Sequence, residues 1–220
     1  MTKVDLVVFD MIGTTVEASP RVPEAFKAAY EVADIALSAE DISSIRGKSK
    51  REAILELLER NDKAIELAEP VYNAFRSYLV DCYRDGPVNA ISGADDTFSW
   101  CHDHDIQVAL TTGFDREVAN LLIAHLGWDD VVDVIVCNDD VNRGRPAPDL
   151  IMAAMERLQK IDVSRVASVG DTVSDLEAGA NAGTGINVGV LSGAHKRQQL
   201  SSVPHTALID SVAELPALLA

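Results

Sequence analysis

The chain has few of the features that bind nucleic acid or anionic lipid. Its 220 residues include 19 Lys and Arg against 35 Asp and Glu, and the formal net charge is −16. Such a surface repels phosphate backbones and anionic headgroups, so we expect no nucleic-acid partner and no membrane. A small anion must instead be attracted by local cations, backbone N–H groups or a metal ion.

Cysteine and long apolar runs are also scarce. The three cysteines, Cys82, Cys101 and Cys137, form no CxxC pair, which argues against a disulfide framework or a zinc knuckle. We expect them to be buried, reduced thiols. The first apolar run, residues 6–9, is too short for a signal-peptide core, and later runs fall far short of a membrane span. These absences predict a cytoplasmic protein.

The pattern of the chain predicts a doubly wound α/β fold. Short Val-rich runs alternate with amphipathic helical segments after residue 87, a rhythm typical of a parallel sheet with helices on both faces. Residues 20–83 show helical periodicity alone, which indicates a small helical cap inserted after the first strand. We predict a core domain of residues 1–17 and 88–220 and a cap domain of residues 18–87. Strands are predicted at 4–9, 106–110, 134–137, 166–169, 186–190 and 207–209, and helices at 50–58, 64–83, 116–126, 149–158 and 174–182.

Polar residues follow the predicted strands. In doubly wound sheets the ligand lies beyond the carboxyl ends of the strands, so these positions are the candidate site. They include carboxylates, hydroxyls, glycines and cations. The segments are Asp10-Met11-Ile12-Gly13-Thr14-Thr15, Thr111-Thr112-Gly113, Arg143-Gly144-Arg145-Pro146 and Gly170-Asp171-Thr172-Val173-Ser174-Asp175.

Three of these residues are carboxylates, Asp10, Asp171 and Asp175. Brought together they repel one another, and they stay ionised only if a cation neutralises them. Mg²⁺ is the simplest candidate, because it binds a few carboxylate oxygens together with water and substrate oxygens. Alone, a strand-end Asp is more often a turn former or helix cap, and Asp175 a first-turn helix charge. The combined set favours a metal site.

The other polar groups favour a phosphoryl ligand. The Thr112 hydroxyl, the Gly113 N–H and the Arg145 guanidinium are donors that stabilise charge on a transferring phosphoryl group. One carboxylate must then attack phosphorus or activate water. Asp10 is the best placed, since a Gly-containing turn follows it and lets a ligand approach the backbone.

Together, these motifs resemble those of the haloacid dehalogenase superfamily, and the resemblance covers the whole chain. It implies that Asp10 is a nucleophile that forms an aspartyl-phosphate. It also implies that Mg²⁺ is held by Asp10, by the backbone carbonyl of Ile12 and by Asp171, with Asp175 supporting the metal from outside or through water. The matching segments are FDMIGTT, ALTTG, GRPAPD and VGDTVSD.

The same resemblance assigns the groups that hold the substrate. It implies that Thr112 and Arg145 bind the phosphoryl group and orient the nucleophile. We expect Thr14 and Gly113 to contribute to substrate binding at the same turns.

Ile12 is the main departure from the superfamily pattern. Most phosphatases of this superfamily carry a second Asp at this position, two residues after the nucleophile, which protonates the leaving oxygen. Ile12 has no proton to give, and the loss of such an acid costs about 10²–10⁴-fold in rate. Either the leaving group needs no proton there, or the enzyme is slow, or the chain binds an anion without turning it over.

A branch of the superfamily, the phosphonatases or phosphonoacetaldehyde hydrolases, also lacks that second Asp. In this branch a cap lysine forms a Schiff base with the substrate aldehyde, and Gly47-Lys48-Ser49-Lys50 is similar to its motif. The resemblance implies that Lys50 is this lysine, at a basic helix start that lowers the pKa of an amine. Lys50 alternatively belongs to a solvated helix start or recognises an anion electrostatically. Lys48 is expected at the surface or attracting substrate.

Other phosphonatase features are missing, which leaves the substrate open. Ala53 replaces the cap His, Phe114 replaces a Tyr, and the linker at residues 18–20 lacks a Cys. We therefore expect a hydrolase of a small organophosphorus metabolite, cleaving either a C–P bond or the C–O bond of an ester such as a phosphoglycolate-type substrate. A non-catalytic anion-binding member is a further alternative. The oligomeric state stays open, a homodimer being one option.

Overall fold

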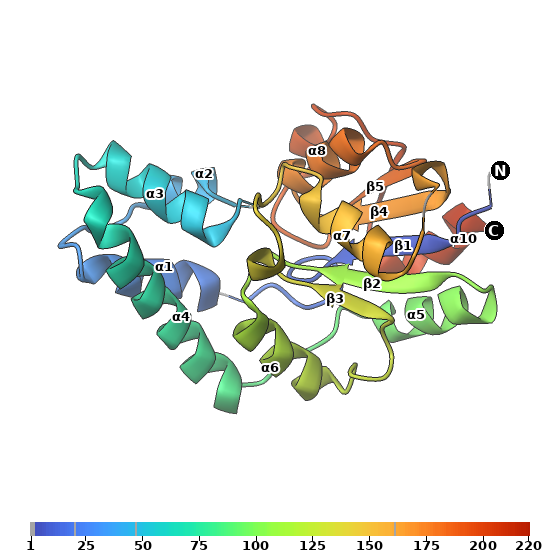
Figure 1. The fold of residues 1–220 in the computed structure, drawn as a ribbon, viewed down its shortest axis with the longest axis horizontal. Coiled ribbons are helices and arrows are strands. Elements are labelled where there is room, and N and C mark those ends of the chain that lie inside the picture. Colours follow the sequence, from blue (N-terminus) through green and yellow to red (C-terminus); the bar gives the residue numbers. More distant parts are fainter. Residues whose placement is uncertain (1–2, 20, 47, 161) are drawn as a thin grey trace.

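A parallel sheet of six strands forms the centre of the computed structural model, which describes residues 3–19, 21–46, 48–160 and 162–220 (Figure 1). The strand order is β3-β2-β1-β4-β5-β6, so β1 lies between the two halves of the sheet. Two residues of the sequence argument, Pro20 and Gly47, lie outside the described residues. The strands are β1 Leu6–Asp10, β2 Gln107–Thr111, β3 Val134–Val136, β4 Val166–Gly170, β5 Ile186–Val190 and β6 Ala207–Ile209.

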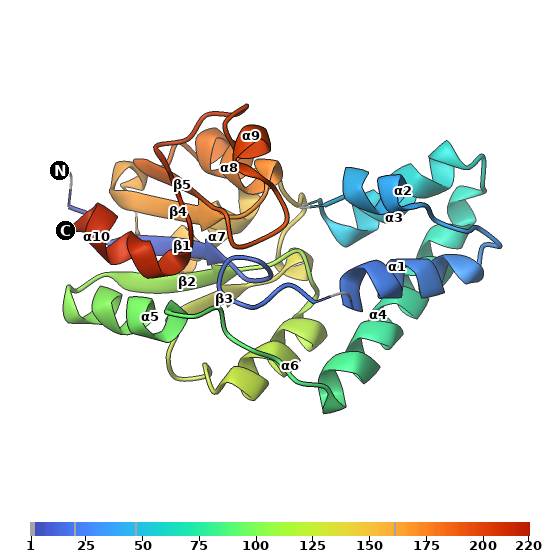
Figure 2. The same cartoon turned by 180° about the vertical axis from the view of Figure 1, so that it is seen from behind.

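Helices cover both faces of the sheet, as predicted (Figure 2). Successive side chains of a strand point to opposite faces, and β1 is buried throughout. Its Leu6 and Val8 pack in the cluster that includes residues of α7 and α8, whereas Val7 and Phe9 pack in the larger cluster with α5 and α6. The core helices are α5 Ala94–Asp103, α6 Arg116–Leu126, α7 Asp149–Arg157, α8 Val173–Ala182, α9 Arg197–Leu200 and α10 Leu215–Leu219, with 3-10 turns η2 Asn138–Asp140, η3 Val163–Arg165 and η4 Val212–Glu214.

The cap is a bundle of helices at one end of the sheet (Figure 1). Its two connections to the core run side by side, because Glu17 N donates to Asn89 O at 2.9 Å and Ile91 N donates to Thr15 O at 2.8 Å. These paired connections lie where the domain division is predicted. The cap elements are α1 Arg21–Glu31, α2 Ala39–Ser44, α3 Lys50–Arg60, η1 Ile65–Leu67 and α4 Ala68–Asp85.

The predicted elements are present, and most of their ends are shifted by no more than two residues. The helix predicted at 64–83 differs more, because the 3-10 turn η1 comes first and α4 begins only at Ala68. The helix at 116–126 and the strands at 186–190 and 207–209 match in full, and Pro70 lies in the first turn of α4. Trp128 is buried, whereas Trp100 is only partly buried. Cys101 and Cys137 are buried, and Cys82 is half-buried. No helix of the described residues is both long and apolar enough to cross a membrane.

Two helices that begin beside the carboxyl edge of the sheet are capped by side chains at their N-termini. Asp115 caps α6, its side chain accepting from Val118 N at 3.1 Å. Thr172 and Asp175 form a reciprocal capping box at the start of α8. Such side chains satisfy N–H groups that have no partner inside the helix. Side-chain hydrogen bonds therefore fix the first turns of α6 and α8.

A cluster of edge-to-face aromatic rings packed against β1 generates a stability prediction. Phe98 is fully buried, with ring centroids 5.4 Å from Phe9 and 5.1 Å from Trp128. Removing a buried Phe side chain leaves a cavity as well as losing burial, so Phe98→Ala should lower the free energy of unfolding by about 3–5 kcal/mol. Urea unfolding followed by tryptophan fluorescence measures it. Ile65→Ala, at a site 67% exposed, should change it by less than about 0.5 kcal/mol, and equal effects would contradict the prediction.

Candidate active site

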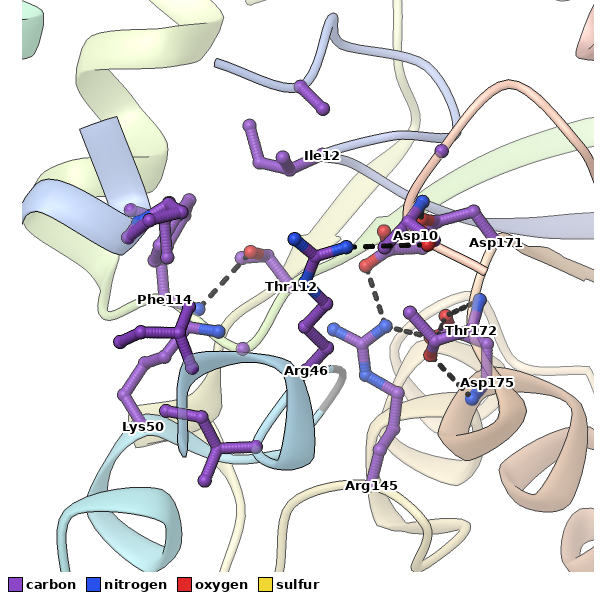
Figure 3. Close-up of a pocket in the computed structure, with 18 of the residues that line it drawn as sticks. Asp10, Ile12, Arg46, Lys50, Thr112, Phe114, Arg145, Asp171, Thr172 and Asp175 are labelled. Atoms are coloured by element: carbon purple, nitrogen blue, oxygen red, sulfur yellow. Dashed lines mark hydrogen bonds and ion pairs between the residues drawn. The ribbon is translucent and has the colours of Figure 1, made fainter. Parts of the chain in front are cut away.

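Asp10 is the last residue of β1, at the carboxyl edge of the sheet between β2 and β4 (Figure 3). Its side chain lines a cavity of about 240 Å³ between the core and the cap. It is only 7% exposed, and its Oδ1 accepts from Arg145 Nη1 at 2.6 Å. The position agrees with the expected ligand edge of a doubly wound sheet.

Arg145 connects two of the three predicted carboxylates. Its Nη1 also donates to Asp175 Oδ1, so one buried guanidinium neutralises charge on both Asp10 and Asp175. Asp175 Oδ2 accepts from the N–H and hydroxyl of Thr172. Asp175 therefore makes an ion pair through one oxygen and accepts two hydrogen bonds at the other.

Asp171 directly follows β4 and is 2% exposed. Its Oδ2 accepts from Ala194 N at 2.6 Å, and its Oδ1 accepts from the Thr14 hydroxyl at 3.3 Å. Burial raises the pKa of this carboxyl well above its ordinary value, and the nearby Asp10 raises it further. The ionised form therefore needs a positive charge that these hydrogen bonds do not supply.

The donor set fits a divalent cation. Asp10, Asp171 and Asp175 each offer a carboxylate oxygen, and these oxygens lie within 4.8 Å of one another. Arg145 contributes one positive charge, directed at Asp10 and Asp175. Clustered, buried carboxylate oxygens are the ligands that a hard cation such as Mg²⁺ prefers.

Glycines allow the backbone to close tightly around Asp171. Gly13 has φ +94°, and a Cβ there would lie 2.5 Å from Asp171 Oδ2. A Cβ at Gly193 would lie 1.9 Å from the same atom. Any larger residue at either position must displace Asp171 or its own loop.

Thr112 and Gly113 line the cavity on the β2 side. The Thr112 hydroxyl oxygen accepts from Phe114 N at 3.1 Å, so the segment after β2 turns immediately. Ile12 also lines the cavity, with its apolar side chain where the superfamily phosphatases carry an acid. The role expected for the Ile12 carbonyl stays a prediction.

Lys50, the first residue of α3, brings an amine from the cap into the same cavity. Its Nζ lies 5.6 Å from the centroid of the Phe114 ring. Burial and the nearby Arg145 lower the pKa of this amine to about 8, although Asp10 and Asp171 oppose the shift. A larger neutral fraction of the amine at physiological pH is what a nucleophilic lysine requires.

Two residues expected to bind substrate lie elsewhere. Lys48 is not among the described residues that line the cavity, and its Nζ pairs with Glu56 along α3. Thr14 is fully buried behind Asp171 and also does not line it. The structure therefore places Thr14 in support of a carboxylate and Lys48 on the cap surface.

The cap wall of the cavity was not identified from the sequence. Arg46 lines the cavity, although the sequence argument treated it only as a basic neighbour of Lys50. Apart from Ser19, the remaining cap wall is apolar. Its members are Val22, Pro23, Phe26, Ile42 and Ile45.

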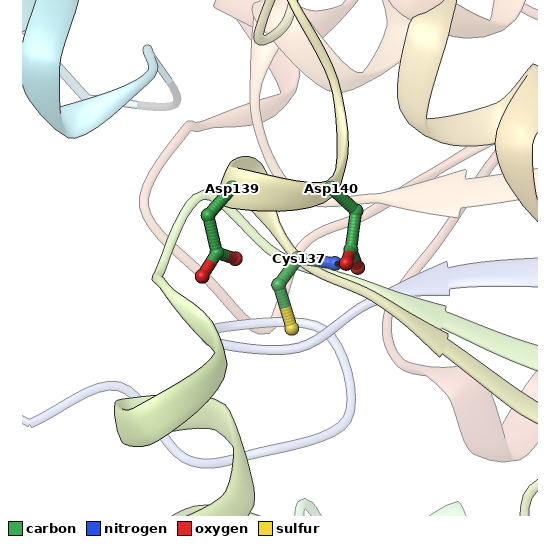
Figure 4. Close-up of side chains that lie close together, drawn as sticks. All are labelled: Cys137, Asp139 and Asp140. Atoms are coloured by element: carbon green, nitrogen blue, oxygen red, sulfur yellow. Dashed lines mark hydrogen bonds between the residues drawn. The ribbon is translucent and has the colours of Figure 1, made fainter.

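A second cluster of metal-ligand residue types, Cys137, Asp139 and Asp140, lies beyond β3 (Figure 4). Asp140 already pairs with Arg116 and Arg157. Burial raises the pKa of the Cys137 thiol to about 12, which disfavours the thiolate that binds metals. This cluster is explained by its ion pairs and needs no metal.

The packing around Asp171 generates a metal-binding prediction. Gly193→Ala inserts a Cβ 1.9 Å from Asp171 Oδ2, so it should weaken Mn²⁺ or Mg²⁺ binding about 10-fold or more, as changes around metal ligands do. Isothermal titration calorimetry measures the affinity.

Gly127→Ala is the matched control for Gly193→Ala. Gly127 has φ +68° with no atom within 4 Å of an added Cβ, so Gly127→Ala should cost about 1–2 kcal/mol of stability but leave metal affinity unchanged. Equal metal affinities of the Gly193→Ala variant and the wild type would refute the prediction.

The comparisons with known proteins agree with this geometry. A family model described as haloacid dehalogenase-like hydrolase matches residues 4–183. The phosphonoacetaldehyde hydrolase of Lactiplantibacillus plantarum is 26% identical over 253 residues, covering 97% of this chain and 94% of the relative.

Two solved structures show a similar fold. A phosphonoacetaldehyde hydrolase-like protein from Oleispira antarctica has a TM-score of 0.88 at 23% identity, covering 98% of this chain and 91% of that one. A protein described as a phosphoglycolate phosphatase from Lactobacillus delbrueckii has a TM-score of 0.83 at 18% identity, covering 99% of each chain. Because the family model spans most of its length, the chain belongs to the haloacid dehalogenase-like hydrolases.

Proposed function

We propose that this hydrolase is a Mg²⁺-dependent, phosphonatase-like enzyme that transfers phosphorus from a small organophosphorus metabolite to Asp10 and then to water. The observation that carries the proposal is the shared cavity. Asp10, the candidate phosphoryl-binding groups Thr112 and Arg145, and the cap amine of Lys50 all line it. The similarity to phosphonoacetaldehyde hydrolases supports the same proposed function.

The proposed protein ligands of the metal are Asp10, Asp171 and the Ile12 carbonyl. Asp175 is proposed to support the metal site from outside this ligand set. When bound, Mg²⁺ would neutralise charge on the carboxylates and on the phosphoryl oxygens. Arg145 holds Asp10 through its 2.6 Å contact and directs the free carboxylate oxygen toward the ligand. This arrangement lets an anionic nucleophile approach an anionic phosphoryl group.

In the proposed first step, a carboxylate oxygen of Asp10 attacks phosphorus, and the bond from phosphorus to the leaving atom breaks with its electron pair on that atom. The product on the enzyme is an aspartyl-phosphate. Water then attacks this intermediate, which releases phosphate and restores the Asp10 carboxylate. The Thr112 hydroxyl and Gly113 N–H are placed to donate to the phosphoryl oxygens.

Lys50 is proposed to activate a C–P bond. Its neutral amine adds to the substrate aldehyde and expels water, which forms an imine on Nζ. The electron pair of the C–P bond then moves into the protonated imine and leaves an enamine, so no acid is needed at the Ile12 position. Protonation of the enamine at carbon and addition of water then release an aldehyde and restore the Lys50 amine. The reduced pKa of Lys50, about 8, supports this role.

An alternative function is hydrolysis of a C–O phosphate ester, such as a phosphoglycolate-type ester. Ala53 stands where phosphonatases carry a cap His, and apolar side chains form most of the cap wall of the cavity. In that case Lys50 contributes its charge rather than a covalent bond.

Asp10→Asn tests the nucleophile. The amide has no negative charge and is a poor nucleophile, so phosphate release should fall by at least about 10⁴-fold for every substrate that the wild type hydrolyses. A malachite-green assay with Mg²⁺ across a panel of phosphonates and phosphate esters measures it. A panel on which the wild type is wholly inert would support an anion-binding protein instead.

Borohydride trapping separates the two bond types. With phosphonoacetaldehyde and borohydride, the C–P mechanism predicts a reduced adduct on Lys50, found by peptide mass spectrometry and absent from Lys50→Arg. Because only the neutral amine adds to the aldehyde, kcat/KM should rise with pH and level off above about 8. No adduct, together with phosphate release from simple esters, would reject C–P cleavage.

A further inference from the structure

The leaving group of the proposed reaction must face the cap. In-line attack places the leaving atom on the side of phosphorus opposite the Asp10 oxygen. Asp10 lies at the edge of the sheet, and the cap closes the other side of the cavity (Figure 3). Ile12, which lines the same cavity, offers neither a proton nor a charge to that atom.

The cap supplies two charged side chains to the cavity within the described residues, Lys50 and Arg46. Lys50 lies against the aromatic ring of Phe114. Arg46 follows α2 and extends over Asp10 and Asp171 (Figure 3). It makes no ion pair with a described residue, so its charge is available to a ligand.

A hydrogen bond from the cap to the core holds Arg46 in place. Its Nη1 donates to the Ala194 carbonyl at 3.4 Å. The N–H of the same residue, Ala194, donates to Asp171 Oδ2 at 2.6 Å. The guanidinium is therefore anchored on the loop that positions Asp171, with further N–H groups left to donate.

We propose that Arg46 is a catalytic residue that binds the leaving atom and stabilises the negative charge that develops there, in place of the missing acid. The inference rests on the C–O ester form of the proposed function, because in the C–P form the electron pair of the breaking bond enters the imine and no leaving oxygen becomes charged. As the Asp10 oxygen bonds to phosphorus, the electron pair of the breaking P–O bond stays on the leaving oxygen, to which Arg46 N–H groups donate. A guanidinium keeps its protons, so the oxygen takes its proton from water.

Two substrates of similar size test this role. Acetyl phosphate releases acetate, whose charge is delocalised, whereas ethyl phosphate releases an alkoxide whose charge needs stabilisation. Arg46→Met should lower kcat/KM for ethyl phosphate about 10²-fold or more, the usual effect of losing a donor to developing charge, and for acetyl phosphate by no more than about 3-fold. Arg46→Lys keeps the positive charge but lacks the planar guanidinium. Its kcat/KM for ethyl phosphate should therefore lie between the values of the wild type and of Arg46→Met.

Controls separate this role from folding and binding. Arg60→Met removes another cap arginine, one that pairs with Glu56 outside the cavity, and should leave both rates unchanged. Thermal unfolding of Arg46→Met should match the wild type, since Arg46 is exposed over much of its surface. An equal loss on both substrates would assign Arg46 to phosphoryl binding and overturn the proposal.

The wild type itself gives two further decisive outcomes. Turnover of acetyl phosphate with none of ethyl phosphate would overturn the Arg46 role, because the cation would then fail to activate an alkoxide. Inactivity on both substrates would also overturn the Arg46 role, because that role acts only on an ester. Phosphate release from phosphonoacetaldehyde that is lost in Asp10→Asn would then show that the Asp10 chemistry itself still holds. The two failures are therefore distinguishable.

Discussion

The site depends on keeping three carboxylates together in a buried place. Asp10 ends β1, and Asp171 and Asp175 lie in the segment that follows β4. Oxygens of the three carboxylates gather within 4.8 Å. Repulsion at that range is large away from water, and it raises the pKa of Asp171. Arg145 offsets part of it through Asp10 and Asp175. Under the proposed function, the remaining negative charge attracts a divalent cation. Gly193 permits the close packing that keeps Asp171 in place.

The chemistry is divided between two parts of the chain. The core contributes the anions and the phosphoryl-binding groups, and the cap contributes cations and an apolar wall. The two connections between the parts are hydrogen-bonded side by side at residues 15–17 and 89–91. The cap thereby holds Lys50 and Arg46 at the cavity that Asp10 lines, and charge interactions are stronger in a site from which water is excluded.

The sequence predicted the core better than the cap. Asp10 and Asp171 were predictable because each directly follows a buried strand, and the carboxyl ends of neighbouring parallel strands meet at one edge. The directions of the Lys48 and Arg46 side chains could not be predicted. A long side chain has many rotamers, and partners elsewhere in the chain decide which one it adopts. Glu56 pairs with Lys48, and the Ala194 carbonyl directs Arg46 to the cavity. These partners lie 8 and 148 residues away in the chain.

The apolar cap wall restricts which organic groups a substrate of this cavity can carry. Val22, Phe26, Ile42 and Ile45 offer no hydrogen-bond partners on the side that faces the leaving group. A sugar hydroxyl buried there would lose its water without replacement, at a cost of about 1–3 kcal/mol for each group. A carbonyl or a short alkyl chain has no such penalty, because its polar atom can face Lys50 or Arg46 while its carbons contact the wall. The cavity therefore favours a small phosphonate or ester over a sugar phosphate under the proposed function.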